Sequence, residues 1–351
     1  MTLFTPTLLR WYKEHGRMDL PWRNITDPYL IWVSEVILQQ TQVAQGLNYY
    51  LRFIQAFPTF KDLAVAQEDE VLRLWQGLGY YSRARNMHAA AKYVANKEKF
   101  PATYEEIRQL KGIGEYTAAA ICSFAYNQPY AVLDGNVYRV LSRYFGISTP
   151  IDTTAGKKEF SYLANELLDQ KNSAVYNSAI MDFGALQCRP KAPNCQQCPL
   201  QETCSAYTHN KVEELPIKSK KVKIRERFFT YVVFTHSNTI FLQKRAAGDI
   251  WQGLYEPLLI ENNSSKNVKE IINTLSGTLQ HQAYTLSPIA ESVLHILTHQ
   301  RLNINFYEIK LETIPDFIRK EFTAAVEIEN IHEYGMPQVV KKILINYFLN
   351  K

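Results

Sequence analysis

The pattern of apolar and polar positions divides the chain into two parts of different character. In residues 1–205 the apolar side chains recur mostly at helical spacing, and little of the alternation that predicts strands is found. The run YLIWVSEVILQQTQV predicts a helix, and Asp27-Pro28 before it is a typical start, with a capping side chain followed by proline. Thr59 and Thr103 are similar start signals. The predicted helices are interrupted by glycines at positions 77, 79, 112, 114, 135 and 146. The first part is therefore predicted to be all-helical.

The second part follows a polar, lysine-rich stretch, residues 209–224, which is interrupted by Pro216 and predicts a linker. Two runs of β-branched and aromatic residues in RFFTYVVFTHSNTIFLQKR flank His-Ser-Asn, a pattern typical of a hairpin. HILTHQRLNINFYEIKL predicts two more strands, and NVKEIINTL and MPQVVKKILINYFLN predict helices. Residues 225–351 are therefore predicted to form a separate α/β domain after a helical region at 1–208.

The composition is that of an ordinary soluble globular protein, with 46% hydrophobic and 21% charged residues in 351. No apolar run is long enough to span a membrane, and the N-terminus lacks a signal-peptide pattern, so we expect a cytoplasmic protein. The net charge of +5 comes from residues 1–224, because positive and negative side chains are equal in number in 225–351. This surplus fits a polyanionic partner but is small.

One segment, LKGIGEYTAAAICSFAYNQPYAVLDGNV, combines two chemical features. Gly112 and Gly114 lie between two helical patterns, where glycine permits a tight turn that presents backbone N–H groups to a phosphate. Asp134 follows 20 residues after Gly114 and is a candidate acid. Considered alone, Asp134 is also compatible with an ordinary turn, since Asp-Gly is a common turn pair.

Four of the five cysteines form a compact cluster with the spacing C-x6-C-x2-C-x5-C: Cys188, Cys195, Cys198 and Cys204. Thiolates this close together predict a shared metal or an iron–sulfur cluster, and the chemistry alone leaves zinc open. Cys122 lies apart on an apolar helical face and is predicted to be a core residue.

Glu35 is placed inside the apolar helical run VSEVILQQT. If it faced inward, burial would raise its pKa and keep a proton available for general acid catalysis. Composition alone favours the alternative, in which Glu35 lies on the wet face of an amphipathic helix.

Many motifs occur in one order: LPWRNITDPYLIWVSEVILQQTQV, WQGLGYYSRARNMHAAA, LKGIGEYTAAAI, VLDGNVYRVLSR, YNSAIMDFGALQC and the cysteine spacing. Together they resemble the MutY adenine DNA glycosylases over residues 20–205. This resemblance implies a helix-hairpin-helix glycosylase fold of two helical subdomains, 20–136 and 1–19 with 137–208. The second would carry a [4Fe–4S] cluster on the four cysteines, and 225–351 would be a Nudix-like domain that recognises 8-oxoguanine.

The implied activity is base excision repair by a monofunctional glycosylase. It would act as a monomer on double-stranded DNA and hydrolyse the N-glycosidic bond of adenine mispaired with 8-oxoguanine or guanine. In the family, the glutamate at the position of Glu35 protonates adenine N7, and the aspartate at the position of Asp134 stabilises the sugar cation. One carboxyl group thus acts as a proton donor and the other as an anion. Tyr116 and Asn136 would support that step.

The resemblance also implies a set of DNA-binding residues. Trp22 and Arg23 would line the adenine pocket, and the hairpin with Gly112 and Gly114 would hold a phosphate. The remaining positions would wedge into the helix, hold the orphaned partner base or contact 8-oxoguanine: Gln40, Thr41, Leu78, Tyr80, Thr298 and His299. Leu78 and Tyr80 are alternatively core residues, and Thr298 and His299 ordinary residues of a hairpin.

Four departures from the family pattern stand out. Lys111 occupies the usual position of proline in the hairpin, and Ser178 replaces the Gln or Glu that contacts adenine. Leu297 replaces an aromatic residue in the recognition loop. Residues 225–351 contain no REXXEE metal helix, so we expect binding without nucleotide hydrolysis.

Two other functions remain as alternatives. An endonuclease III-like glycosylase/lyase would carry lysine at the position of Tyr116, and it would lack a domain such as 225–351. A non-catalytic DNA-binding protein would have no use for both Glu35 and Asp134.

Overall fold

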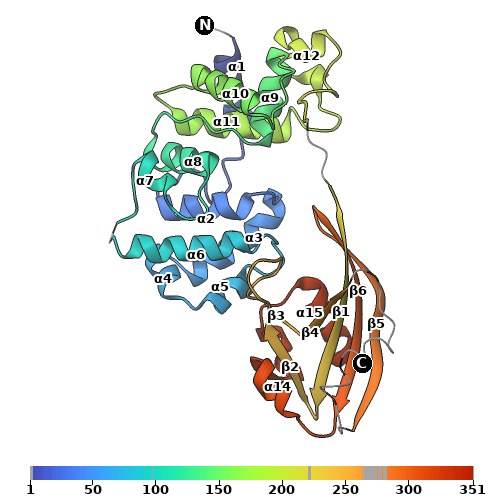
Figure 1. Ribbon diagram of the computed structural model, residues 1–351. Helices are drawn as coiled ribbons and strands as arrows, with labels where there is room; N and C mark the ends of the chain where they lie inside the picture. The colour runs from blue at the N-terminus through green and yellow to red at the C-terminus, as the bar shows by residue number, and fades with distance from the viewer. Residues whose placement is uncertain are drawn as a thin grey trace. The chain divides into compact units, whose positions relative to one another are not determined.

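The computed structural model describes residues 3–97, 99–219, 223–262, 264, 275, 279 and 283–350. The chain separates into two compact units, Met1–Val65 with Ala89–Lys221, and Ala66–His88 with Val222–Lys351 (Figure 1). Residues 66–88 therefore pack with the C-terminal strands. The predicted domains, 1–208 and 225–351, assign this segment to the helical region instead. The helix predicted at 267–275 lies outside the described residues, apart from Leu275.

The first unit is helical, as predicted. Its helices are α1 (Phe4–His15), α2 (Pro28–Leu38), α3 (Val43–Ala56), α4 (Phe60–Val65), the C-terminal part of α6 (Ser82–Ala95), α7 (Tyr104–Arg108), α8 (Glu115–Tyr126), α9 (Gly135–Phe145), α10 (Thr154–Leu167), α11 (Ser173–Leu186) and α12 (Ser205–Thr208). Two short 3₁₀ turns, Cys195–Gln197 and Gln201–Thr203, lie among the cysteines.

The predicted start signals are confirmed in the caps. The side chain of Asp27 accepts hydrogen bonds from the first turn of α2, and Thr103 forms a reciprocal capping box with Glu106 at α7. Gly135 does not interrupt a helix but is the first residue of α9, whose cap is Asp134. α9 ends at Phe145 and is followed by the C-cap Gly146, whose φ of 71° suits a residue without a side chain.

Two sets of helices pack together within the first unit. α1, α9 and α11 enclose an apolar core with Phe4, Leu8, Val140 and Phe183 at its centre, all with at most 2% of their surface exposed. α2 packs against α8 and α3, and α8 also contacts α11. Cys122 of α8 is fully buried, as predicted. Since α8 contacts both sets, it brings side chains of α2 and α11 close to one another.

The second unit contains α5 (Glu68–Leu74), the start of α6, and a mixed sheet. Its strands are β1 (Arg225–His236), β2 (Thr239–Lys244), β3 (Tyr255–Glu256), β4 (Leu258–Asn262), β5 (Tyr284–Ile296), β6 (Gln300–Leu311) and β7 (Ala324–Glu327), with α14 (Asp316–Glu321), the 3₁₀ helix Ile328–Glu333 and α15 (Gln338–Phe348).

β1 is the central strand of this sheet, which runs β3-β2-β1-β6-β5. β4 pairs with β1 and β7 with β2. β1 is parallel to β6 and antiparallel to β2, so the predicted β1–β2 hairpin is confirmed. The nearly continuous apolar run of β1 suits a strand buried on both faces. Of the two strands predicted within residues 295–311, the second is β6, whereas β5 begins at Tyr284 and shares only His295 and Ile296 with that range. The predicted C-terminal helix is α15.

The helical segment 66–88 is joined to the sheet domain by polar contacts. The carboxylate of Asp69 accepts hydrogen bonds from Lys244 Nζ at 2.8 Å and from Tyr255 Oη at 3.0 Å. Arg85 Nη1 donates a hydrogen bond to the carbonyl oxygen of Gln252 at 2.8 Å. These bonds explain why the segment belongs to the second unit.

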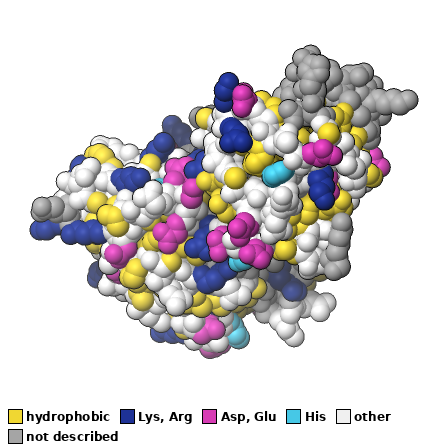
Figure 2. All heavy atoms as spheres, turned by 90° about the horizontal axis from the view of Figure 1, so that it is seen from below, with side chains coloured by type: hydrophobic (Ala, Val, Ile, Leu, Met, Phe, Trp, Pro, Cys, Tyr) yellow, Lys and Arg dark blue, Asp and Glu magenta, His cyan; other side chains and the backbone are white. Residues whose placement is uncertain are grey.

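Charges of both signs are interspersed over the face drawn in Figure 2, and neither sign forms one continuous patch there. Within the described residues, no helix is both long and apolar enough to cross a membrane.

Candidate active site

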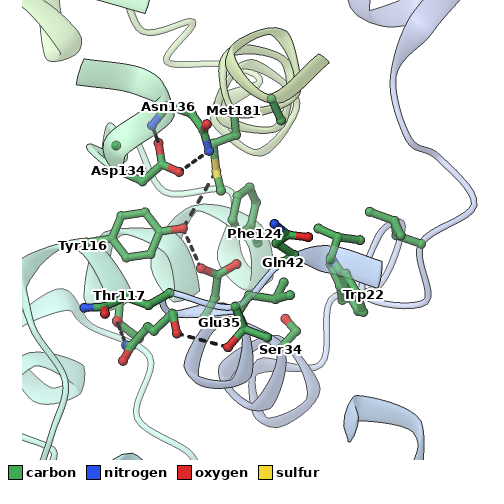
Figure 3. A pocket seen from close by; sticks show the side chains of 18 of the residues that line it. Trp22, Ser34, Glu35, Gln42, Tyr116, Thr117, Phe124, Asp134, Asn136 and Met181 are labelled. Carbon is green, nitrogen blue, oxygen red and sulfur yellow. Dashed lines mark hydrogen bonds between the residues drawn. The ribbon is translucent and has the colours of Figure 1, made fainter. Parts of the chain in front are cut away.

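A cavity of about 840 Å³ in the first unit brings together most of the predicted catalytic and DNA-binding residues (Figure 3). It is lined by side chains from the segment before α2, from α2 and from the starts of α8 and α9. The predicted residues that line it are Trp22, Arg23, Glu35, Gln40, Thr41, Gly114, Tyr116, Asp134 and Asn136. Residues far apart in the sequence thus share one cavity.

Glu35 is a buried acid on the inner side of α2, with 6% of its surface exposed. The wet-face interpretation of its helix is therefore wrong. The pKa of Glu35 is raised to about 7, chiefly by burial and to a smaller extent by nearby Asp134, although the Tyr116 hydrogen bond and the charge of Arg23 oppose the rise. At neutral pH a substantial fraction of this carboxyl group retains its proton.

Tyr116 lies in the first turn of α8 and connects Glu35 to the wall of the cavity. Its hydroxyl donates to Glu35 Oε2 at 2.8 Å and lies 3.9 Å from the sulfur of Met181 (Figure 3). Burial and the neighbouring carboxyl groups raise the pKa of Tyr116 well above 10, so the phenol stays protonated and acts as a donor.

Asp134 caps α9 and points into the same cavity. Its Oδ1 accepts the backbone N–H groups of Asn136 and Val137, both at 2.8 Å, and its Oδ2 accepts Asn136 Nδ2 at 2.7 Å. Burial raises the pKa of Asp134, and these three hydrogen bonds oppose that rise. Asn136 is itself held by Arg139, which donates to its Oδ1 at 2.8 Å. Asp134 therefore has a structural role at a helix start and is also exposed to the cavity.

Trp22 and Arg23 form another part of the wall. The indole of Trp22 packs edge-on against Tyr50, with ring centroids 5.2 Å apart. Arg23 donates to Ser178 Oγ and, at 3.1 Å, to Asp182 Oδ1. Ser178, the position of the expected adenine contact, is buried and is not among the residues that line the cavity.

Sequence reasoning missed several residues of this site. The cavity is also lined by Arg17, Ser34, Phe124 and Met181, and Asp182 lies behind Arg17 and Arg23. A signal for Asp182 was available, because it lies one helical turn after Ser178 in YNSAIMDFGALQC.

The hairpin before α8 has the predicted tight geometry. Gly112 adopts a φ of 82°, and Gly114 is the N-terminal cap of α8 without a side-chain capping bond. Gly114 lines the cavity and Gly112 does not. Gln40, with a φ of 56°, and Thr41 form the turn after α2 at the edge of the cavity.

The remaining predicted residues meet in the second unit. Leu78, Tyr80, Thr298 and His299 line a cavity of about 360 Å³, together with Arg85 and Trp251. The hydroxyl of Tyr80 donates to Thr298 Oγ1 at 2.7 Å, across 218 positions of sequence. Leu78 is buried, whereas Tyr80 is 41% exposed and has a φ of 45°, so the core interpretation does not suit Tyr80.

The four clustered cysteines line a single small cavity of about 30 Å³ with apolar side chains such as Phe183 and Leu200. Arg143 Nη1 lies 3.5 Å from Cys188 Sγ. Among the described residues, no three His, Cys, Asp or Glu side chains are grouped so that they could hold a metal ion. The donor set, four thiols around an apolar cavity, fits a group that fills the space between them.

These features correspond to those of known families. Residues 33–168 match the HhH-GPD superfamily of base excision DNA repair proteins, and residues 229–346 match the NUDIX domain. Fold and site thus define a base excision DNA repair protein of the HhH-GPD superfamily. The adenine DNA glycosylase of Buchnera aphidicola subsp. Acyrthosiphon pisum is 34% identical over 99% of this chain and 98% of its own length. The chain therefore belongs to the adenine DNA glycosylase family, MutY, whose members are enzymes of base excision repair.

Other relatives agree with this assignment. The adenine DNA glycosylase of Homo sapiens is 42% identical over 61% of this chain and 41% of that protein. Among solved structures, a thermostable thymine-DNA glycosylase is 30% identical with a TM-score of 0.55, and covers 59% of this chain and 96% of its own. An endonuclease III–DNA complex, 20% identical with a TM-score of 0.51 over 59% of this chain and 94% of its own, shares the fold.

Proposed function

We propose that this enzyme is a monofunctional glycosylase that removes adenine mispaired with 8-oxoguanine or guanine from double-stranded DNA. The observation that carries the proposal is the pair of carboxyl groups, Glu35 buried and Asp134 half-buried, in one cavity with Tyr116 between α2 and α11. Two carboxyl groups in different environments suit glycoside cleavage, which needs a proton donor and an anion.

Glu35 is the proposed general acid. Its pKa of about 7 leaves a proton to donate to adenine N7 at neutral pH, which turns the base into a leaving group. The hydroxyl of Tyr116 orients the carboxyl group by donating to Oε2, so that the other oxygen is left for the base. The target nucleotide would enter the cavity after leaving the base stack.

Asp134 is the proposed stabiliser of the sugar. When the bond between C1′ and N9 breaks, its electrons leave with the protonated adenine and positive charge develops on the deoxyribose. The ionised carboxylate, held by Asn136 and the N-terminus of α9, would stabilise that charge until water adds to C1′ and loses a proton. The products are free adenine and an abasic strand.

The absence of an amine nucleophile supports base release without strand cleavage. Tyr116 occupies the position at which the lyase alternative would carry lysine, and the described residues that line the cavity include no lysine. A Schiff base with the sugar therefore has no candidate nucleophile there.

The second cavity is the proposed recognition site for the 8-oxoguanine partner. Its aromatic and hydroxyl groups, Tyr80 with Thr298 and His299, suit stacking and hydrogen bonding to a base. Leu78 is the proposed wedge beside Tyr80, and because it is buried it would have to move outward to enter the base stack. In the first unit, Gln40 and Thr41 are the proposed contacts to the orphaned base, and the Gly112–Gly114 hairpin is the proposed phosphate site.

Cys188, Cys195, Cys198 and Cys204 are the proposed ligands of a [4Fe–4S] cluster. Four thiols around one apolar cavity provide the required donor set. When bound, the cluster would have a structural role, because it would crosslink the loop after α11 to α12. Separately, we propose that the chain acts as a monomer.

Single-turnover assays with duplexes that contain adenine opposite 8-oxoguanine, guanine or thymine test this function. We expect adenine release from the first two and a strand that is cut only after alkali treatment. Release that does not depend on the partner base would contradict the mispair specificity. Efficient borohydride trapping of the wild-type enzyme on DNA would instead favour the lyase, and binding without release would favour the non-catalytic alternative.

A further inference from the structure

Asp182 is a fully buried acid of α11 that the proposed chemistry does not use. The hydrogen bonds that it accepts from the described residues come from two arginines that precede α2. Its Oδ2 accepts the backbone N–H of Arg17 at 2.9 Å, and its Oδ1 accepts Arg17 Nε at 3.0 Å and Arg23 Nη2 at 3.1 Å. The guanidinium of Arg17 makes a further contact to Oδ1 through Nη2. One carboxylate therefore ties both arginines to α11.

Arg23 is consequently held at two points of the same helix. Its Nη1 donates to Ser178 Oγ and its Nη2 to Asp182, which lies one turn later on the same face of α11. The side chain is only 9% exposed, and its plane lies near Phe124, with Cζ 5.9 Å from the ring centroid. The guanidinium thus has little freedom of movement.

One buried nitrogen of Arg23, Nε, has no hydrogen bond in this arrangement within the described residues. Arg23 nevertheless lines the cavity that holds Glu35. A buried donor without a partner is costly, so an occupant of the cavity that brought an acceptor against Nε would be favoured. The ring nitrogens of a purine that are not protonated offer such acceptors.

We infer that Asp182 is a positioning residue for base release: through Arg17 and Arg23 it fixes the Arg23 guanidinium in the wall of the base cavity. The inference rests on the proposed function, because it assumes that a purine enters this cavity. Ser178 serves as the second anchor, which gives the serine at this position a function that does not require contact with the base.

Asp182 also compensates the charge of Arg23 beside the proposed acid. Glu35 faces Tyr116 of α8, Arg23 before α2 and Asp134 at the start of α9, and among these Tyr116 and Arg23 lower its pKa. Removing the negative charge of Asp182 leaves the guanidinium charges less compensated. The pKa of Glu35 is then expected to fall, so that base release declines at a lower pH than in the wild type.

The test compares full-length Asp182→Asn with the wild type on a duplex with adenine opposite 8-oxoguanine. Displacement of a positioning group by about 1 Å can slow a reaction on the order of 100-fold, and we expect a loss of this size in the single-turnover rate constant. The dissociation constant for a duplex with uncleavable 2′-fluoroadenosine should change less than about threefold, since remote DNA contacts remain. The fall of rate with pH should move to lower pH.

A rate constant within twofold of the wild type, with an unchanged pH profile, would overturn the inference. A reduced reaction amplitude with an unchanged rate constant and pH profile would also overturn it, because that pattern indicates only a smaller folded fraction. If Asp182→Asn does not fold, the same rate constant is measured for Ser178→Ala. This variant removes one of the two hydrogen bonds that hold the Arg23 guanidinium and leaves the buried charges in place. A rate constant about tenfold lower at full amplitude would then support the positioning role, and an unchanged one would refute it. If the wild type itself releases no adenine, the proposed function fails, irrespective of Asp182.

Discussion

Replacement of Glu35 by glutamine should make the protein more stable at alkaline pH while it removes the acid. Burial raises the pKa of Glu35 from 4.5 to about 7, so the folded state favours the protonated carboxyl group more than the unfolded state does. The wild type therefore loses stability as the pH rises from about 4.5 to about 7, and the loss is complete above that range. With 1.36 kcal/mol for each pKa unit, the loss amounts to about 3 kcal/mol.

Glutamine has the same shape, carries no charge at any pH and can still accept the Tyr116 hydrogen bond. We therefore expect Glu35→Gln to exceed the wild type in unfolding free energy by about 3 kcal/mol at pH 8.5 and by about 1 kcal/mol at pH 5. For a helical unit of this size, the difference at pH 8.5 corresponds to roughly 6–12 °C in its melting temperature.

The assay is thermal unfolding followed by circular dichroism at both pH values, at equal iron content. Glu115→Gln is the matched control, since Glu115 lies next to Tyr116 on the same helix but has 82% of its side chain exposed. Its melting temperature should change by less than about 2 °C, as is usual for surface positions. If Glu35→Gln gained no stability at pH 8.5, or gained equally at pH 5, Glu35 would not be the buried acid described here.

Three further outcomes are expected. Tyr116→Phe removes a hydrogen bond that lowers the pKa of Glu35, so the decline of single-turnover base release should move to higher pH; a shift to lower pH would contradict the assigned bond. Thr298→Val removes the acceptor of Tyr80, so the preference for 8-oxoguanine over guanine should fall about 2- to 10-fold in competition binding, with binding to undamaged duplex unchanged; an intact preference would exclude the second cavity from partner recognition. Cys198→Ser should lower the iron content and the visible absorbance of the purified protein, and a colourless wild type that contains zinc would refute the cluster.

The helical part and the strands β1, β2 and β6 could be predicted from the sequence, because their signals are local. The caps at Asp27 and Thr103 and the β1–β2 hairpin depend on neighbouring residues, and the structure confirms them. The position of residues 66–88 in the second unit could not be predicted, since it depends on contacts such as that between Asp69 and Lys244, 175 positions apart.

The same distinction holds for the site. The helical run around Glu35 is apolar on several sides, so periodicity alone could not show which way the side chain points. The resemblance supplied that answer, and the structure gives its cause, because α8 covers α2 at this point. The bonds from Asp182 to Arg17 and Arg23 span more than 150 positions and have no local signature.

The pH dependence of adenine release by the wild type tests the central claim most directly. Single-turnover rate constants would be measured from pH 5.5 to 9 on a duplex with adenine opposite 8-oxoguanine, at saturating enzyme. Since Glu35 must be protonated to act, the rate constant should be nearly level below pH 6.5 and fall towards tenfold per pH unit above about 7. A rate constant that stays level or rises through pH 7–9 would contradict the assignment of Glu35 as the general acid.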